Sequence, residues 1–426
     1  MRGTSRAERF GFGKRRTLSD IGSFEPKSID EGMVSDMKRG MMFLTISALL
    51  TACGDPAFRW GEELRVEVET VGVVVQVRNV GDGPEWRFER VLRLGAVEGG
   101  PEEFGRIRSL VADGDRNVYV ADNLAHEVRV FGPDGSHLRS IGRRGEGPGE
   151  FGSLYSLSWL GEDLIAMDPG NARLAILSRE GDWRGSIQSF PITGPASLIR
   201  LHSLGSMGFY APVIDPDRFG LQFASVLTAG GGDTIPAPRP PQEANSTGVL
   251  CHRPDGGITS ISLPEAPAIV YGFPPPGGVL AVSWTDQYRV QLVGPSGDTT
   301  RAVVREGPRV LYPDSLWDQG IRPYRELREE FPGAQCEPSS PERPRYRAAL
   351  RHLLFDESGR LWVEAAVEGG FVWEVFDAEG RLRGAAPAPP RAPGIPPYAR
   401  DGHLYQVEVD EMDVQFVAVY RLTDGV

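Results

Sequence analysis

A repeat of about 46 residues constrains the fold of this chain more than any other feature. Residues 99–135 and 147–181 share a Gly-rich lead-in, four short runs of Val, Ile, Leu and Tyr, and turns of the Asp-Gly or Glu-Gly type. Phe151 lies 47 positions after Phe104. Repeats of roughly 40–50 residues with four β runs are typical of propellers, in which each repeat is one four-stranded antiparallel blade. The chain is therefore expected to be all-β.

The second and third β runs of the repeat are its most characteristic parts. In the first unit they are Val-Tyr-Val-Ala-Asp at 118–122 and Val-Arg-Val-Phe at 128–131, after a lead-in that ends in Glu-Phe at 103–104. These residues resemble the NHL repeat, and the chain is similar to bacterial lipoproteins that form six-bladed NHL-like β-propellers. The resemblance is close over residues 99–187, and residues 353–380 support it.

Weaker copies of the repeat continue along the chain. They lie at residues 207–224, 278–298, 353–380 and 401–420. The expected number of blades is therefore six, and a seventh would have to lie between residues 236 and 270. The last copy stops after its third strand, while residues 64–68 and 73–77 form a strand pair outside any blade. An N-terminal strand is expected to complete the last blade and close the ring, which removes exposed edges.

The N-terminal segment predicts export and lipid attachment. Residues 37–53 combine a basic start, an apolar core and small residues before Cys53, which is the order of a secretory signal peptide whose core is too short to span a membrane. The final Leu-Thr-Ala-Cys matches the bacterial lipobox, and this resemblance implies that Cys53 is acylated and becomes the new N-terminus. The alternative is an uncleaved helix with an incidental cysteine. Residues 1–36 are interpreted as an over-extended start or a disordered segment, with Met33 or Met37 as the true start.

Charge is distributed unevenly on the two sides of Cys53. Beyond it the chain has 37 Arg, no Lys and 52 Asp and Glu, a net charge of −15. Such a surface repels nucleic-acid phosphate unless a local basic patch opposes it, so nucleic acid is not an expected partner. The expected location is the bacterial cell envelope, with the membrane contacted through the lipid anchor. Gly54, and not Asp, follows the cysteine, which is compatible with sorting to the outer membrane.

Two further cysteines follow Cys53 in the chain. Cys251 and Cys336 could form one disulfide in an oxidising compartment, or remain as two partly buried thiols. The chain has no Cys-x-x-Cys motif and no Cys/His cluster, so a structural zinc site is not expected. Residues 313–332 are the one helical candidate, either packed on the ring or acting as a lid.

An acidic residue recurs at one position of every expected blade, at the loop between the second and third strands. These residues are Asp122, Asp168, Asp215, Asp286, Glu368 and Asp410. A ring of carboxylates at the mouth of a channel could hold Ca²⁺ through oxygen ligands. The competing interpretation is structural, because Asp at a strand end accepts hydrogen bonds from nearby backbone N–H groups.

Catalytic motifs do not occur in this sequence. It has no Gly-x-Ser-x-Gly elbow, Walker loop, His-Glu-x-x-His motif or EF-hand loop, and no residue is assigned a catalytic role. The leading hypothesis is a lipid-anchored, non-catalytic module that binds a protein, peptide or glycan and uses no cofactor. The alternative is a Ca²⁺-dependent hydrolase or lyase working in the propeller channel, and a third interpretation is a structural envelope protein without a ligand.

Overall fold

The computed structural model describes residues 63–424, except 97–98, 189–201, 204–207, 215–220, 228–233, 237–247, 276–277, 295–296 and 308. The chain divides into two compact units, Met1–Asp55 and Pro56–Val426, and all described residues belong to the second. Among these residues no helix is both long and apolar enough to cross a membrane. The signal segment, Cys53 and Asp215 lie outside the described residues.

The two close repeats form the first two blades, each an antiparallel four-stranded sheet in chain order. The first blade is β4 (Ile107–Ala112), β5 (Val118–Asp122), β6 (Glu127–Phe131) and β7 (His137–Ile141). The second is β8 (Ser156–Leu160), β9 (Asp163–Asp168), β10 (Arg173–Leu177) and β11 (Trp183–Gln188), with a 3₁₀ turn at Pro169–Asn171. The strands predicted at 118–122 and 128–131 are therefore β5 and β6.

Four further blades follow along the chain, and the fold is a six-bladed β-propeller. The third is β12 (His202–Ser203), β13 (Gly208–Ile214), β14 (Leu221–Leu227) and β15 (Thr234–Pro236). The fourth contains β18 (Ile269–Gly272), β19 (Leu280–Trp284), β20 (Arg289–Val293) and β21 (Thr299–Glu306). The fifth is β23 (Leu350–Phe355), β24 (Leu361–Val367), β25 (Gly370–Phe376) and β26 (Leu382–Pro387). The sixth contains β27 (Tyr398–Arg400), β28 (His403–Val409) and β29 (Gln415–Asp424).

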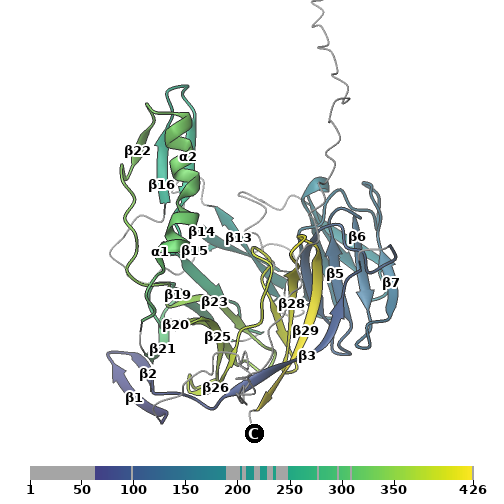
Figure 1. Cartoon of the computed structure of the whole chain (residues 1–426). Helices are drawn as coiled ribbons and strands as arrows, with labels where there is room; N and C mark the ends of the chain where they lie inside the picture. The colour runs from purple at the N-terminus through teal and green to yellow at the C-terminus, as the bar shows by residue number, and fades with distance from the viewer. Residues whose placement is uncertain are drawn as a thin grey trace, which may run out of the picture. The chain divides into compact units, whose positions relative to one another are not determined.

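An N-terminal strand completes the sixth blade, as the sequence predicted. This strand is β3 (Trp86–Leu94), which pairs antiparallel with β29 and gives the order β27-β28-β29-β3 (Figure 1). The strand pair expected at 64–68 and 73–77 exists as β1 (Arg65–Val71) and β2 (Val74–Val80), but it does not close the ring. Instead β2 lies parallel to β21, so the fourth blade has six strands.

Asn79 ties β2, which pairs with the fourth blade, to the fifth blade as well. Its side chain is fully buried, donates to the carbonyl oxygen of Gly380 at 3.0 Å and accepts from the backbone N–H of Leu382 at 2.8 Å. These bonds fix β2 to the β25–β26 hairpin of the fifth blade. Val77, two residues earlier, is also buried. One polar side chain and one apolar one thus fix the position of the N-terminal hairpin.

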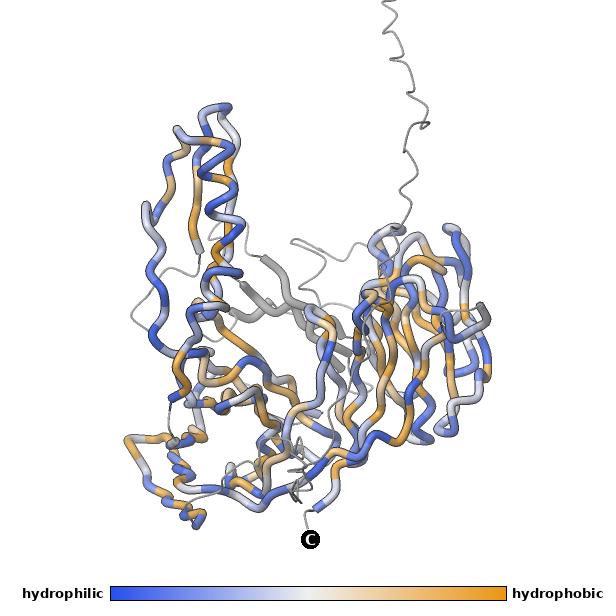
Figure 2. Tube along the Cα trace, in the orientation of Figure 1, coloured by the Kyte–Doolittle hydropathy of each residue, from blue (hydrophilic) through white to orange (hydrophobic). Residues whose placement is uncertain are grey.

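Hydrophobic cores lie between neighbouring blades. Buried clusters join the sixth blade to the first, the first to the second, the fourth to the fifth and the fifth to the sixth. Trp362 and Trp373 of the fifth blade are the largest fully buried side chains. Successive side chains of a strand point to opposite faces, and both faces are covered here, so hydrophobic residues are frequent along the strands (Figure 2).

A small module is built from two insertions on either side of the fourth blade in the chain. It contains β16 (Gly248–His252), β17 (Ile258–Ser262), α1 (Asp314–Gly320), α2 (Arg322–Glu330) and β22 (Gln335–Glu337). The β16–β17 hairpin lies within residues 236–270, the part of the sequence in which a seventh blade was considered. It forms a three-stranded sheet with β22 instead (Figure 1). Cys251 and Cys336 face each other across β16 and β22 and are joined by a disulfide, with their Cα atoms 4.0 Å apart.

Candidate functional site

Five of the six predicted acidic residues are described, and they occupy equivalent places. Each lies at the end of the second strand of its blade or in the loop to the third strand, in blades one, two, four, five and six. They therefore lie at the same end of their blades, as the repeat implied. The sixth, Asp215, lies outside the described residues.

Asp122 is committed to the backbone of its own blade. Its carboxylate is fully buried and accepts from the N–H groups of Gly105 at 2.8 Å and Arg106 at 2.9 Å, in the loop that leads into β4. It also accepts from two N–H groups of the turn after β5 and lies 3.6 Å from the guanidinium of Arg129. Its bonding capacity is used locally, which favours the structural interpretation.

Asp168 repeats this arrangement in the second blade. It accepts from the N–H groups of Gly152 at 3.0 Å and Ser153 at 2.9 Å, and from the side chain of Asn171 at 2.7 Å. Its other partner is Arg173, at 3.3 Å. The recurring Asp thus closes the loop between blades in both close repeats.

The remaining three acids have separate surroundings. Asp410 accepts from the N–H groups of Met412 and Val414 and closes its own turn. Glu368 is exposed in the turn between β24 and β25, and Asp286 lies in the loop between β19 and β20. Within the described part of the chain, no three His, Cys, Asp or Glu side chains gather in a way that could hold a metal ion. The five described acids therefore provide no assembled calcium site.

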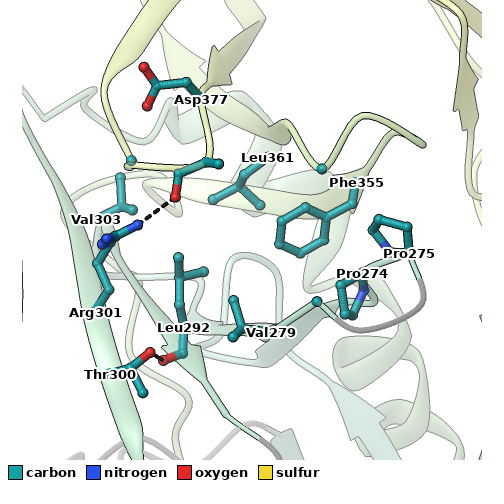
Figure 3. Close-up of a pocket in the computed structure, with 14 residues that line it drawn as sticks. Pro274, Pro275, Val279, Leu292, Thr300, Arg301, Val303, Phe355, Leu361 and Asp377 are labelled. Carbon is teal, nitrogen blue, oxygen red and sulfur yellow. Dashed lines mark hydrogen bonds between the residues drawn. The ribbon is translucent and has the colours of Figure 1, made fainter.

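A crevice of about 390 Å³ lies between the fourth and fifth blades (Figure 3). Its walls include Leu292 of β20, Val303 of β21 and Leu361 of β24, which are all buried. Phe355 and Pro274 line it as well. It is bordered by the turns between first and second strands and between third and fourth strands, so it lies at the opposite end of these blades from the acidic loops.

Three polar side chains stand around the crevice. The guanidinium of Arg301 donates to the carbonyl oxygen of Ala378, which links the outer part of the fourth blade to a turn of the fifth (Figure 3). Thr300 donates its hydroxyl proton to the carbonyl oxygen of Leu292 at 3.2 Å. The Asp377 carboxylate accepts from backbone N–H groups of its own turn, and it points away from the apolar side chains (Figure 3). The crevice thus combines an apolar interior with one cation at its rim.

Gly380 keeps this crevice narrow at the turn of the fifth blade. Its φ of +81° is a left-handed conformation, and an added Cβ would lie 2.7 Å from a methyl carbon of Val303. Only glycine both adopts this left-handed φ without strain and leaves the space beside Val303 empty.

A second hollow, of about 580 Å³, lies between the sixth and first blades. It is at the end that carries the acidic loops, and its polar lining includes Glu103, Arg106, Asp413 and Gln415. Only two of its eleven lining residues lie in strands, whereas six of the fourteen residues that line the crevice do. Because sites on strands hold their geometry better than sites on loops, the crevice is the stronger candidate.

Two buried carboxylates of the fifth blade are held by arginines. Glu364 is fully buried, and although burial opposes ionisation, hydrogen bonds from Arg351 and Arg391 outweigh it and lower its pKa. Glu374 lies 2.9 Å from Arg305 and accepts from the hydroxyl of Tyr288, whose pKa is raised well above its usual value by burial and by the Glu374 charge. Both carboxylates are therefore engaged by structural partners.

The crevice was not predicted from the sequence. No sequence motif marks the residues that line it. The apolar walls come from runs that any blade of this type contains. To predict the crevice, one would have to know which turns of the fourth and fifth blades meet, and the sequence does not show this.

The comparisons with known proteins agree with the architecture. A family model described as a 6-bladed beta-propeller matches residues 102–170, which cover most of the first two blades. No curated protein matches the chain.

Several solved structures are similar in part. A Bacteroides fragilis protein described as exported is 11% identical, with 80% of this chain and 95% of that chain covered and a TM-score of 0.42. A Staphylococcus aureus virginiamycin B lyase is 10% identical, with 80% of this chain and 99% of that chain covered and a TM-score of 0.35. A gluconolactonase of Xanthomonas campestris is 14% identical, with 74% of this chain and 86% of that chain covered and a TM-score of 0.33. At such low identity and TM-score these likenesses bear on neither activity nor ligand.

Proposed function

We propose that the mature chain is a lipid-anchored, non-catalytic binding module of the bacterial cell envelope, whose ligand is a protein or peptide that places an apolar side chain in the crevice between the fourth and fifth blades. The crevice is the observation that carries the proposal. Its volume of about 390 Å³ falls in the range of roughly 300–1,000 Å³ of ligand sites, which combine apolar walls with a few polar groups.

The chemistry of the walls favours a protein or peptide over a glycan. Buried Leu292, Val303 and Leu361 offer no hydrogen bonds to sugar hydroxyls, but they match the side chain of a Leu, Ile or Phe. Arg301 can receive a carbonyl or carboxylate of the ligand at the rim. The carboxylate of Asp377 is occupied by its own turn, so these residues support binding more than acid–base catalysis.

The anchor rests on the lipobox at residues 50–53. The first described residue of the propeller, Glu63, lies ten residues after Cys53, so the lipid would hold the propeller close to the membrane surface. Cys53→Ala should release the exported protein from membranes and abolish incorporation of a labelled fatty acid. Retention of the label in this variant would refute acylation at Cys53.

Binding is tested with a variant that fills the crevice. Thr300→Trp places a large side chain at its rim, and Thr423→Trp is a matched control, because both hydroxyls donate to a backbone carbonyl at 3.2 Å. Membrane extracts are passed over the immobilised mature protein at increasing concentrations, and the amount of each captured protein is measured. We expect a saturable partner with the wild type and with Thr423→Trp, and its loss with Thr300→Trp. Equal capture by both variants would refute the crevice as the site.

A further inference from the structure

The β1–β2 hairpin, at the outside of the fourth blade, ends in an exposed apolar tip (Figure 1). This hairpin tip, residues 70–75, reads Thr-Val-Gly-Val-Val-Val and contains no charged residue, in a chain of which 24% is charged. Val71 is 57% exposed and Val73 is 87% exposed. Gly72 lies between them with a φ of +64°, and no described atom lies within 4 Å of the place that its Cβ would take. Exposed apolar side chains that gather at one point mark an interaction surface.

The base of the hairpin is fixed to the ring, so the hairpin tip has a firm support. β2 pairs with β21 over six residues, and the buried side chain of Asn79 bonds to the fifth blade. Glu69, the acid nearest the hairpin tip in sequence, accepts from the side chain of Gln76 at 2.8 Å and lies 3.4 Å from the guanidinium of Arg78. The charge of Glu69 is therefore compensated within the hairpin.

We propose that the hairpin tip inserts into the surface of the lipid bilayer to which this chain is anchored. The proposal rests on the lipid anchor of the proposed function, because an acylated Cys53 keeps the bilayer within reach. Glu63, the first described residue, lies ten residues after Cys53, so the chain between them spans at most about 35 Å. β1 then runs roughly 20 Å from Arg65 to Val71. The anchor can therefore bring the bilayer to the hairpin tip.

The chemistry of the hairpin tip favours lipid over a protein partner. Its side chains are valines and one threonine, whereas protein interfaces are enriched in aromatic residues and arginine. Val71 pairs with Val74 across the turn, so backbone hydrogen bonds are made within the hairpin, as insertion into lipid requires. A single anchor leaves the attached propeller free to rotate, and a second contact with the same bilayer would fix its orientation.

Insertion of the hairpin tip also determines where the crevice between the fourth and fifth blades lies relative to the bilayer. Asn79 is six residues after Val73, and this separation is roughly 20 Å at the rise of a β-strand. The Asn79 side chain donates to the carbonyl oxygen of Gly380, which lines the crevice. The ligand of the crevice would therefore be bound close to the membrane surface.

Flotation with phosphatidylcholine vesicles tests insertion without the anchor. The protein is the soluble Cys53→Ala chain, and the double variant Val71→Ser and Val73→Ser removes the exposed valines of the hairpin tip. The matched control is Val409→Ser with Met412→Ser, because these residues are 40% and 71% exposed at the β28–β29 hairpin. We expect the partition coefficient to fall about 30-fold for the hairpin-tip variant, since two valines lose their burial, and less than about two-fold for the control.

Fluorescence of the full, lipidated chain in vesicles tests the depth of insertion. Val73→Cys and, as the control, Met412→Cys each carry a nitrobenzoxadiazole label, while Cys251 and Cys336 are joined in the disulfide. We expect the label at position 73 to shift to shorter wavelength and to be quenched by brominated lipids, and the label at position 412 to show neither effect.

Three results would overturn the proposal. They are no flotation of the soluble chain with native valines, an equal fall in partition for the hairpin-tip variant and its control, and equal quenching at positions 73 and 412. Absence of fatty acid on Cys53 would overturn the anchor alone, because flotation of the Cys53→Ala chain does not depend on it. The two proposals can therefore fail separately.

Discussion

The Cys251–Cys336 disulfide should make a large and measurable contribution to stability. The two residues are 85 positions apart, and the segment between them contains all four strands β18 to β21 of the fourth blade. A disulfide stabilises a fold mainly by restricting the unfolded chain, and the restriction grows with the length of the closed loop. The perturbation is the double change Cys251→Ser and Cys336→Ser.

The size of the effect follows from the loop length. For about 85 residues the chain-entropy relation gives a loss of roughly 15 cal/mol/K, which is about 4.6 kcal/mol at 25 °C. Removal of native disulfides typically costs about 2–5 kcal/mol, so this pair should lie near the upper end. The backbone pairing of β16 with β22 remains available without the bond and is not part of this figure.

The assay is urea denaturation of the soluble protein in a Cys53→Ala background, followed by tryptophan fluorescence. We expect the midpoint to fall in the double Ser variant and in the reduced wild type by the same amount, and reducing agent to leave the double Ser variant unchanged. A difference below about 1 kcal/mol would refute the reasoning, because it would mean that the module opens without unfolding the fourth blade. If reducing agent also destabilised the double Ser variant, loss of the disulfide could not be the cause of its effect on the wild type.

Two further changes probe the polar interior. Glu364→Ala leaves Arg351 and Arg391 without their shared carboxylate, and should lower the free energy of unfolding in urea by about 3–5 kcal/mol. The control is Glu368→Ala, at an exposed acid of the same blade, which should lower it by less than about 0.5 kcal/mol. Burial, followed by the hydrogen bond to Glu408, raises the pKa of Tyr420 to about 12, so the neutral phenol contributes stability in full below pH 10, and this contribution is lost as pH rises toward 12. Unfolding free energies measured across this range should fall less steeply for Tyr420→Phe, and an unchanged slope would contradict the assignment.

Local chemistry was sufficient to predict the blades. The run at 118–122 is rich in residues that favour strands and ends in Asp, and an Asp-Gly turn follows at 134–135. Both the strand and the turn are therefore specified by a few neighbouring residues. The same holds for residues 353–363, which contain the end of β23 and the start of β24. The structural role of Asp122 and Asp168 was one of two predicted interpretations, and their bonds to backbone N–H groups support it.

The sites depend on contacts that no local pattern encodes. The crevice needs the turn at 377–380 to meet β21, and residues of these two segments are typical of any blade. No sequence motif therefore marks the crevice. The acidic positions were detected because they recur with the repeat, which is a property of the fold and not of a ligand.

Strand periodicity and turn residues act over short distances, so the amino-acid sequence is enough to predict an all-β chain with blades of four strands. It also predicts that an N-terminal strand completes the last blade. Which strand takes that place depends on long-range contacts that are seen only in the folded structure. β3 and not the preceding hairpin pairs with β29, and Asn79 bonds across 301 and 303 residues to Gly380 and Leu382. Such pairings depend on which edges and turns the ring brings together.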